Sequence, residues 1–205
     1  DMKKELNSYE LANISYNIEK NKLCETVGIQ DQIATSFGGF NSVQINKDGS
    51  YQISPINLST ESLENFLQRL VLVYTGQTRR ATDIAESKVK NIVNKEKEYK
   101  AIQDMVSEAK NYLLKNDIKN FGLLMNDAWH IKRELSSRIT NKEIDKLYNY
   151  GIENGAIGGK ILGAGGGGFL MLYASQKIQT DLQSKFRSKN SFNIKVDTAG
   201  TRLTY

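Results

Sequence analysis

The chain has 205 residues, of which 39% are hydrophobic and 25% charged, and its formal net charge is +5. The single cysteine, Cys24, excludes a framework of internal disulfides, and with only one histidine, His130, a zinc site of cysteines and histidines is excluded too. No apolar run reaches the roughly 20 residues of a membrane-spanning helix. We therefore expect a globular, cytoplasmic protein with no membrane partner.

The small basic excess does not identify a partner, because a surplus of this size is common on solvated protein surfaces. Nucleic-acid-binding proteins usually carry a basic stripe, often interleaved with aromatic side chains that stack on bases. The sequence has no such stripe. A nucleic acid is therefore not expected as a partner, whereas a phosphorylated small molecule is compatible with the charge.

Residues 1–58 predict two helices followed by a hairpin. Apolar residues at helical spacing predict a helix over residues 8–23, with Ser8 as its N-cap. A second, short helix is expected over residues 30–37, because Gly38 stands where a left-handed residue commonly ends a helix. An Asp-Gly pair between two alternating segments predicts a hairpin over residues 43–53.

The only proline, Pro55, predicts a domain boundary near residue 58, and helices and strands are mixed beyond it. The expected helices cover residues 61–70, 80–97, 102–113, 118–135, 141–154 (with Asn141 as N-cap) and 176–187. The expected strands cover residues 71–74, 169–173, 192–196 and 202–205. This order has no repeating βαβ unit, so it predicts an α+β fold rather than a doubly wound sheet.

A glycine-rich segment precedes the expected strand 169–173. It consists of Gly163, Ala164, Gly165, Gly166, Gly167 and Gly168. Each glycine costs about 0.5–1 kcal/mol relative to alanine, so a fold keeps such a run where the backbone needs positive φ or close approach. Exposed N–H groups in such a turn can hold an anion, which makes phosphate a candidate ligand. A glycine-rich hairpin that only joins two strands is the alternative.

Two established phosphate motifs do not fit this segment. A P-loop needs Lys-Ser or Lys-Thr after the glycines, and neither follows here. The dinucleotide fingerprint needs a helix after its glycines, whereas the sequence Phe-Leu-Met-Leu-Tyr that follows is typical of a strand.

Two acidic residues near the second helix are candidates for phosphoryl-transfer chemistry. Asp31 lies near the start of that helix, where the helix dipole favours a carboxylate that can orient a substrate hydroxyl. Glu19 ends the preceding helix, and the connection over residues 21–28 can bring it beside Asp31. Two carboxylates together with nucleotide phosphates suit Mg²⁺. The alternative for Asp31 is a favourable first-turn acid without catalytic role.

Taken together, these segments resemble the GHMP small-molecule kinases. The resemblance rests on Gly28-Ile29-Gln30-Asp31-Gln32, on Phe37-Gly38-Gly39-Phe40-Asn41 and on the glycine-rich segment. Thr75-Gly76-Gln77-Thr78-Arg79-Arg80-Ala81, Trp129-His130-Ile131-Lys132 and Gly200-Thr201-Arg202 also look like this family. Within it, the sequence is most similar to the kinases of D-glycero-D-manno-heptose 7-phosphate, with the fucokinases next.

The resemblance implies a two-lobed fold. Residues 1–58 would be the remainder of the N-terminal domain, and residues 59–205 a complete C-terminal domain with an antiparallel sheet covered by helices. It also implies an enzyme that uses ATP and Mg²⁺ to phosphorylate the anomeric hydroxyl of a heptose 7-phosphate. A small-molecule sugar phosphate is thus the expected partner, and a homo-oligomer is compatible with this reading.

The resemblance also implies roles for individual residues. Asp31 matches the catalytic aspartate and Glu19 the glutamate on the magnesium side. Gly163–Gly168 match the third family motif, which packs against the loop that binds the nucleotide phosphates and steadies it. The candidate substrate-binding residues are Gln30, Gln32, Arg79 and Lys132. A surface arginine is the alternative for Arg79. Trp129 is expected in the core and His130 is not expected to be a base.

The sequence departs from the family in lacking the second motif, Pro-x-Gly-Leu-Gly-Ser-Ser-Ser, whose loop surrounds the ATP phosphates. The early substrate-binding motif is absent as well. We therefore expect a full-length parent to be a kinase, and these 205 residues alone to bind ATP weakly or not at all. A fragment or pseudokinase that serves as an assembly surface is the alternative from another class.

Overall fold

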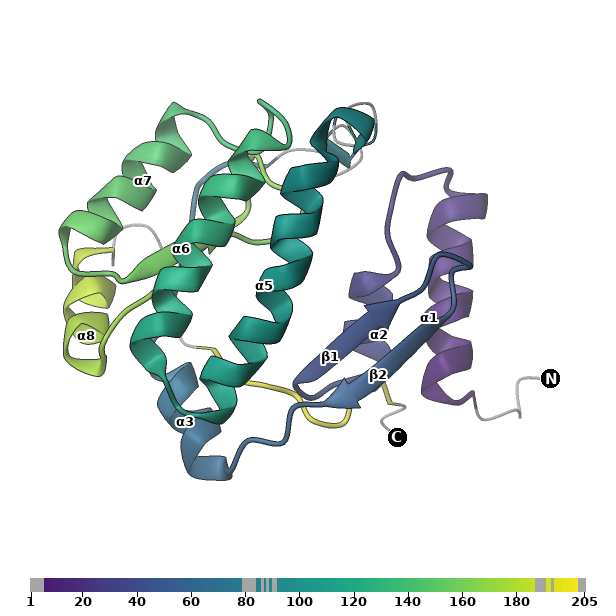
Figure 1. Ribbon diagram of the computed structural model, residues 1–205, viewed down its shortest axis with the longest axis horizontal. Helices are drawn as coiled ribbons and strands as arrows, with labels where there is room; N and C mark the ends of the chain where they lie inside the picture. The colour runs from purple at the N-terminus through teal and green to yellow at the C-terminus, as the bar shows by residue number, and fades with distance from the viewer. Residues whose placement is uncertain are drawn as a thin grey trace. The chain divides into compact units, whose positions relative to one another are not determined.

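The computed structural model describes residues 6–78, 84, 85, 87, 89, 92–186, 191, 192 and 194–202 (Figure 1). The chain divides into two compact units, one formed by Asp1–Asn57 with Lys195–Tyr205 and the other by Leu58–Ile194. The expected second domain, residues 59–205, therefore extends further than the second unit. The reason is that the closing residues hydrogen-bond to the first unit: the N–H of Gly39 donates to the carbonyl of Asp197 at 2.6 Å.

The first unit contains two helices and a hairpin. In chain order these elements are α1 (Ser8–Asn17), the π-helical turn η1 (Ile18–Lys22), α2 (Gln30–Phe37), β1 (Asn41–Ile45) and β2 (Tyr51–Pro55). β1 and β2 pair antiparallel, with Val43 opposite Ile53. The expected second helix and the hairpin are confirmed, since their local signals, a terminal glycine and an Asp-Gly turn, act over a few residues.

The expected N-cap of α1 was wrong by one residue. Asn7, not Ser8, caps the helix: its side-chain oxygen accepts from the N–H of Glu10, and the Glu10 carboxylate accepts from the N–H of Asn7. This reciprocal capping box satisfies two N–H groups at once, and a serine one position later cannot form it with Glu10.

A backbone crossing holds the end of α2. The N–H of Thr201 donates to the carbonyl of Thr35 at 2.9 Å, so the closing segment lies against the last turn of the helix. Gly38 and Gly200 both have positive φ, and a Cβ on Gly38 would overlap the backbone nitrogen of Gly200. A Cβ on Gly200 would lie 2.6 Å from the carbonyl oxygen of Ser36. Only glycine fits at this crossing.

The second unit contains a four-stranded antiparallel sheet in the order β4-β5-β3-β6. Its strands are β3 (Leu70–Tyr74), β4 (Gly158–Ile161), β5 (Phe169–Tyr173) and β6 (Ser191–Phe192). β4 was not predicted, because Gly-Gly-Lys-Ile has little strand propensity of its own. The expected strand 192–196 was wrong beyond Phe192, since residues 194–196 lie outside the sheet, and residues 203–205 of the last expected strand lie outside the described residues.

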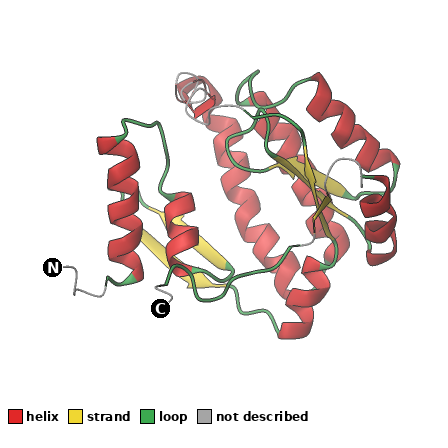
Figure 2. Ribbon diagram, turned by 180° about the vertical axis from the view of Figure 1, so that it is seen from behind, coloured by secondary structure: helices red, strands yellow, loops and turns green. Residues whose placement is uncertain are grey.

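Helices cover this sheet (Figure 2). They are α3 (Thr60–Leu67), the 3₁₀ turn η2 (Ile92–Lys95), α5 (Glu96–Leu114), α6 (Ile118–Glu134), α7 (Lys142–Glu153) and α8 (Gln176–Lys185). α6 packs along β4, while α7 and α8 pack against β5 and β3. The expected helix 80–97 falls partly outside the described residues, and at 92–95 it is a 3₁₀ turn rather than an α-helix. The α+β prediction is confirmed.

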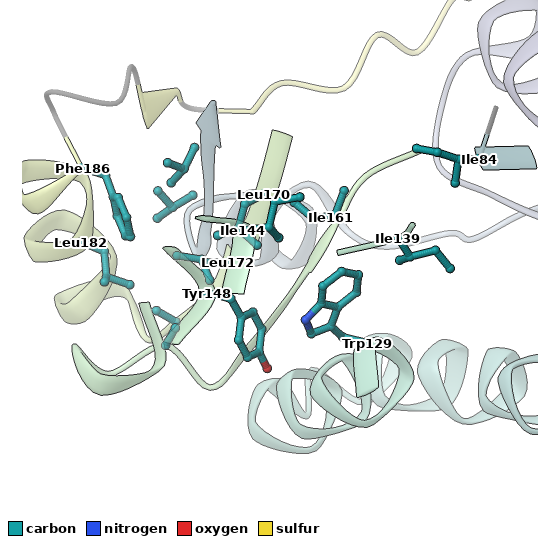
Figure 3. Close-up of a cluster of buried hydrophobic side chains, with 14 of the residues drawn as sticks. Ile84, Trp129, Ile139, Ile144, Tyr148, Ile161, Leu170, Leu172, Leu182 and Phe186 are labelled. Atoms are coloured by element: carbon teal, nitrogen blue, oxygen red, sulfur yellow. The ribbon is translucent and has the colours of Figure 1, made fainter. Parts of the chain in front are cut away.

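The core of the second unit surrounds Trp129 (Figure 3). Trp129, Leu170 and Leu172 are fully buried, and Trp129 lies beside Tyr148 with ring centroids 6.1 Å apart. Tyr173 belongs to a second cluster, on the other face of β5, since adjacent strand residues point to opposite faces. The expectation that Trp129 is a core residue is confirmed. None of the described helices has the length and apolar character needed to cross a bilayer.

We expect Gly200→Ala to lower the free energy of unfolding by about 2–3 kcal/mol, because the added Cβ meets backbone and the residue keeps a positive φ. Urea denaturation measures the change. Gly28→Ala is the matched control: no atom lies within 4 Å of its Cβ, so stability should stay equal or rise by up to about 1 kcal/mol. Equal stability of the two variants would contradict the close crossing.

Candidate functional site

The start of α2 presents Asp31 to solvent. Asp31 lies in the first turn of the helix and is exposed, as is Gln30 beside it. The N-cap residue, Ile29, makes no side-chain capping bond, so the partial positive charge of the helix start acts on the Asp31 carboxylate. Asp31 thus lies at the start of this helix, where the sequence placed it, and its catalytic role stays a prediction.

Gln32, the third candidate in this turn, points to the interior. Its side chain is 5% exposed, and its Oε1 has no hydrogen-bond partner among the described residues. A buried oxygen without a partner needs a donor to offset its desolvation. Gln30, by contrast, is exposed, and the substrate-binding roles of both residues stay predictions.

Glu19 lies in the π-helical turn that ends α1. The side chain is half-buried, and the carbonyl of Glu19 accepts from the N–H of Glu25 at 3.0 Å, which folds the following connection back onto the turn. Single π-helical turns occur often at functional sites. No group of three or more metal-ligating side chains was found among the described residues. Mg²⁺ commonly takes one or two carboxylates plus substrate phosphates, so the role of Glu19 and Asp31 as its donors stays a prediction.

The glycine-rich segment forms the turn that connects β4 with β5. Four of its glycines have positive φ: Gly163, Gly165, Gly166 and Gly168. A Cβ on Gly165 would lie 2.9 Å from Cα of Ile139, and one on Gly167 would lie 2.6 Å from the carbonyl oxygen of Gln77. The run of glycines is thus explained by backbone conformation and by the close approach of two neighbouring segments.

Two N–H groups of this turn bond within the protein. Gly166 donates to the carbonyl of Ile139 at 2.8 Å, and Gly168 donates to the carbonyl of Gln77 at 2.9 Å. These two donors are therefore committed to holding the turn in place. The expected binding of nucleotide phosphates by residues 163–168 stays a prediction, and in this geometry Gly166 and Gly168 support the turn rather than contact an anion.

Lys132 reaches the same turn from α6. Its Nζ donates to the carbonyl of Gly163 at 2.8 Å and to that of Ile161 at 3.2 Å. The ammonium therefore fixes the point where β4 enters the glycine-rich turn. Its proposed contact with a substrate phosphate stays a prediction.

Gln77 and Asn141 support the turn and were not among the predicted site residues. The Asn141 Nδ2 donates to the Gln77 Oε1 at 2.7 Å, while the Asn141 Oδ1 caps α7. The hydroxyl of Thr75 donates to the carbonyl of Gly168 at 2.9 Å. Only the capping role of Asn141 was predictable, because a second bond to a residue 64 positions away has no local pattern.

The predicted site residues belong to both units. Glu19, Gln30, Asp31 and Gln32 lie in the first unit, and Gly163–Gly168 and Lys132 in the second. Arg79 lies outside the described residues. A cleft shared by Asp31 and the glycine-rich turn stays a prediction.

Comparison with known proteins relates part of the chain to a family of kinases. Residues 96–190 match the family model described as GHMP kinases C terminal. Residues 96–190, which include the glycine-rich turn, therefore form a GHMP kinase C-terminal domain.

The chain is also similar to individual kinases of known substrate. The chain is 30% identical over 190 residues to the D-glycero-alpha-D-manno-heptose 7-phosphate kinase of Campylobacter jejuni, a match that covers 91% of this chain and 56% of that protein. It is 27% identical over 176 residues to the bifunctional fucokinase/GDP-fucose pyrophosphorylase of Arabidopsis thaliana, covering 82% of this chain and 17% of that protein. The crystal structure of L. major mevalonate kinase with R-mevalonate matches with a TM-score of 0.71 at 22% identity, over 96% of this chain and 60% of that one.

We expect Lys132→Met to lower the free energy of unfolding by about 1–2 kcal/mol and to speed hydrogen exchange at the Leu162 amide. The lost bonds are charge-assisted, but the lysine is partly exposed. Leu162 reports on the turn because its N–H donates to the carbonyl of Phe169. Lys146→Met, which removes an exposed pair with Glu143, should change stability by less than about 0.5 kcal/mol. Unchanged exchange at Leu162 would contradict the role given to Lys132.

Proposed function

We propose that this chain forms part of an ATP-dependent sugar kinase that phosphorylates the anomeric hydroxyl of D-glycero-D-manno-heptose 7-phosphate. The observation that carries the proposal is Asp31, an exposed carboxylate in the first turn of a helix whose other end is fixed by the glycine crossing. The similarity to the Campylobacter jejuni heptose kinase supports the choice of substrate. The chain covers 56% of that relative, so the activity is proposed for a polypeptide with the remaining length as well.

In the proposed reaction, the Asp31 carboxylate orients the anomeric hydroxyl and accepts its proton. The sugar oxygen forms the new bond to the γ-phosphorus of ATP while the bond between that phosphorus and the β,γ-bridging oxygen breaks, releasing ADP. The transition state of such a transfer is loose, so the carboxylate acts mainly by positioning the hydroxyl. The exposed place of Asp31 in the first turn of α2 suits this role, because a substrate hydroxyl can approach it from solvent.

Mg²⁺ would supply neutralisation of the charge on the ATP phosphates when bound. Glu19 is the proposed ligand on the protein side, since it is half-buried in a π-helical turn of the same unit as Asp31. The glycine-rich turn is proposed to lie beside the nucleotide phosphates, supported by Lys132, Ile139 and Gln77 from behind.

A fucokinase-like activity is the second candidate, favoured by the similarity to the Arabidopsis thaliana enzyme. The two substrates differ by an anionic phosphate. Arg79 and Lys132 are the residues proposed to recognise that phosphate, because cationic side chains form strong charge-assisted bonds with it.

We expect Asp31→Asn to reduce kcat by about 10²–10⁴-fold, since an amide cannot accept the proton. The assay measures ADP release by a chimera that joins these residues to the part of the Campylobacter jejuni relative that the match leaves uncovered. Asp48→Asn is the matched control: Asp48 is an exposed acid of the same unit whose carboxylate accepts from the N–H and hydroxyl of Ser50 in the β1–β2 turn. Wild-type turnover in Asp31→Asn would remove Asp31 from the role of base.

We expect the same chimera to prefer heptose 7-phosphate over fucose by at least about 100-fold in kcat/KM, because fucose lacks the phosphate that forms charge-assisted hydrogen bonds with cationic side chains. Parallel ADP-release assays with the two sugars measure the ratio. Equal or reversed preference would favour the fucokinase-like activity. No ADP release with either sugar would favour a non-catalytic assembly module.

A further inference from the structure

A cavity of about 220 Å³ lies in the second unit, under the paired helices α5 and α6. Four side chains of α5, four of α6, one of β4 and one of β5 line it. Nine of these ten residues are apolar, among them Ile102, Ala109, Ala128 and Met171. The exception is Lys160 of β4. The cavity therefore has an apolar wall and one cationic group.

The sheet register places Lys160 under the helices. Lys160 of β4 pairs with Met171 of β5, so the two side chains lie on the same face, and both line the cavity. The next residue, Ile161, points to the opposite face, where it is fully buried in the core around Trp129. The side chain of Lys160 thus extends under α5 and α6.

Lys160 has no counter-ion in this environment. Within the described part of the chain its side chain makes no hydrogen bond or ion pair, and none of the residues that line the cavity is acidic. Burial lowers the pKa of the Lys160 ammonium. A cation that is partly removed from water without a partner destabilises the fold, and an anion placed next to it would relieve that cost.

The shape and size of the cavity restrict the ligand. Apolar walls favour an apolar body, while the lone ammonium favours a single anionic end group. An apolar cavity of about 150 Å³ holds benzene, and pockets for drug-sized ligands reach about 300–1,000 Å³. At about 220 Å³ this cavity fits a short chain or a single ring.

We propose that this cavity is a binding site for a small amphipathic carboxylate, whose apolar chain lies between α5 and α6 and whose carboxylate pairs with the Nζ of Lys160. Neither Asp31 nor any residue of the glycine-rich turn is among the residues that line the cavity, and the proposal does not depend on the kinase activity. It assigns to Lys160 a binding role that its place in a β-strand would not otherwise suggest.

The test is isothermal titration calorimetry of the 205-residue chain with octanoate, 1-octanol and octylamine. We expect saturable binding of octanoate and at least about tenfold weaker binding of the alcohol, because a charged hydrogen bond contributes about 1.5–3 kcal/mol. Octylamine should not bind. Equal binding of octanoate and 1-octanol would show an apolar site without the lysine contact and overturn the proposal, as would the absence of octanoate binding at about 1 mM.

Substitutions distinguish the contribution of Lys160 to octanoate binding from that of the apolar walls of the cavity. Lys160→Met should weaken octanoate binding at least about tenfold and leave the fold intact, with equal or higher stability in urea because an unpaired buried cation is removed. Lys119→Met, on the exposed surface of α6, is the matched control and should leave binding unchanged. Ala109→Trp should fill the cavity and abolish binding. Unchanged binding in a folded Lys160→Met variant would overturn the proposal.

Discussion

Both parts of the candidate site are held by close contacts between backbone segments. In each contact the segments lie so near to each other that a Cβ would not fit between them. Gly38 and Gly200 cross at the end of α2, and Gly167 lies against the carbonyl of Gln77 in the turn between β4 and β5. In each case hydrogen bonds between backbone groups accompany the contact, so the glycines permit an interaction that fixes position. The conformational entropy that glycine loses on folding is offset by this precise placement.

The close backbone contacts act differently at α2 and at the glycine-rich turn. At α2 the fixed end is the C-terminus, which leaves the first turn with Asp31 free to meet a ligand while the helix axis stays in place. At the glycine-rich turn, Lys132 holds the entry of the turn, and carbonyls of neighbouring segments accept from Gly166 and Gly168. A turn held by these bonds keeps its shape, which would suit the place beside nucleotide phosphates that is proposed for it.

Local signals predicted much of the fold, and long-range contacts explain what was missed. α2, the β1–β2 hairpin and the Asn141 cap follow from a terminal glycine, an Asp-Gly turn and a capping residue, each acting within a few positions. β4 is a strand because it pairs with β5, which its Gly-Gly-Lys-Ile sequence does not reveal. Asp31 was identifiable from its neighbours in sequence, whereas the bonds of Lys132 join residues about 30 positions apart.

The return of residues 195–202 to the first unit makes the second unit an insertion in the chain of the first. The polypeptide consequently passes between the units twice, near residues 57–58 and again near residues 194–195. Insertions of this kind are tolerated where the two ends of a domain lie at its surface. A single proteolytic cut in either passage would leave the units covalently joined through the other, so this architecture resists separation into independent fragments.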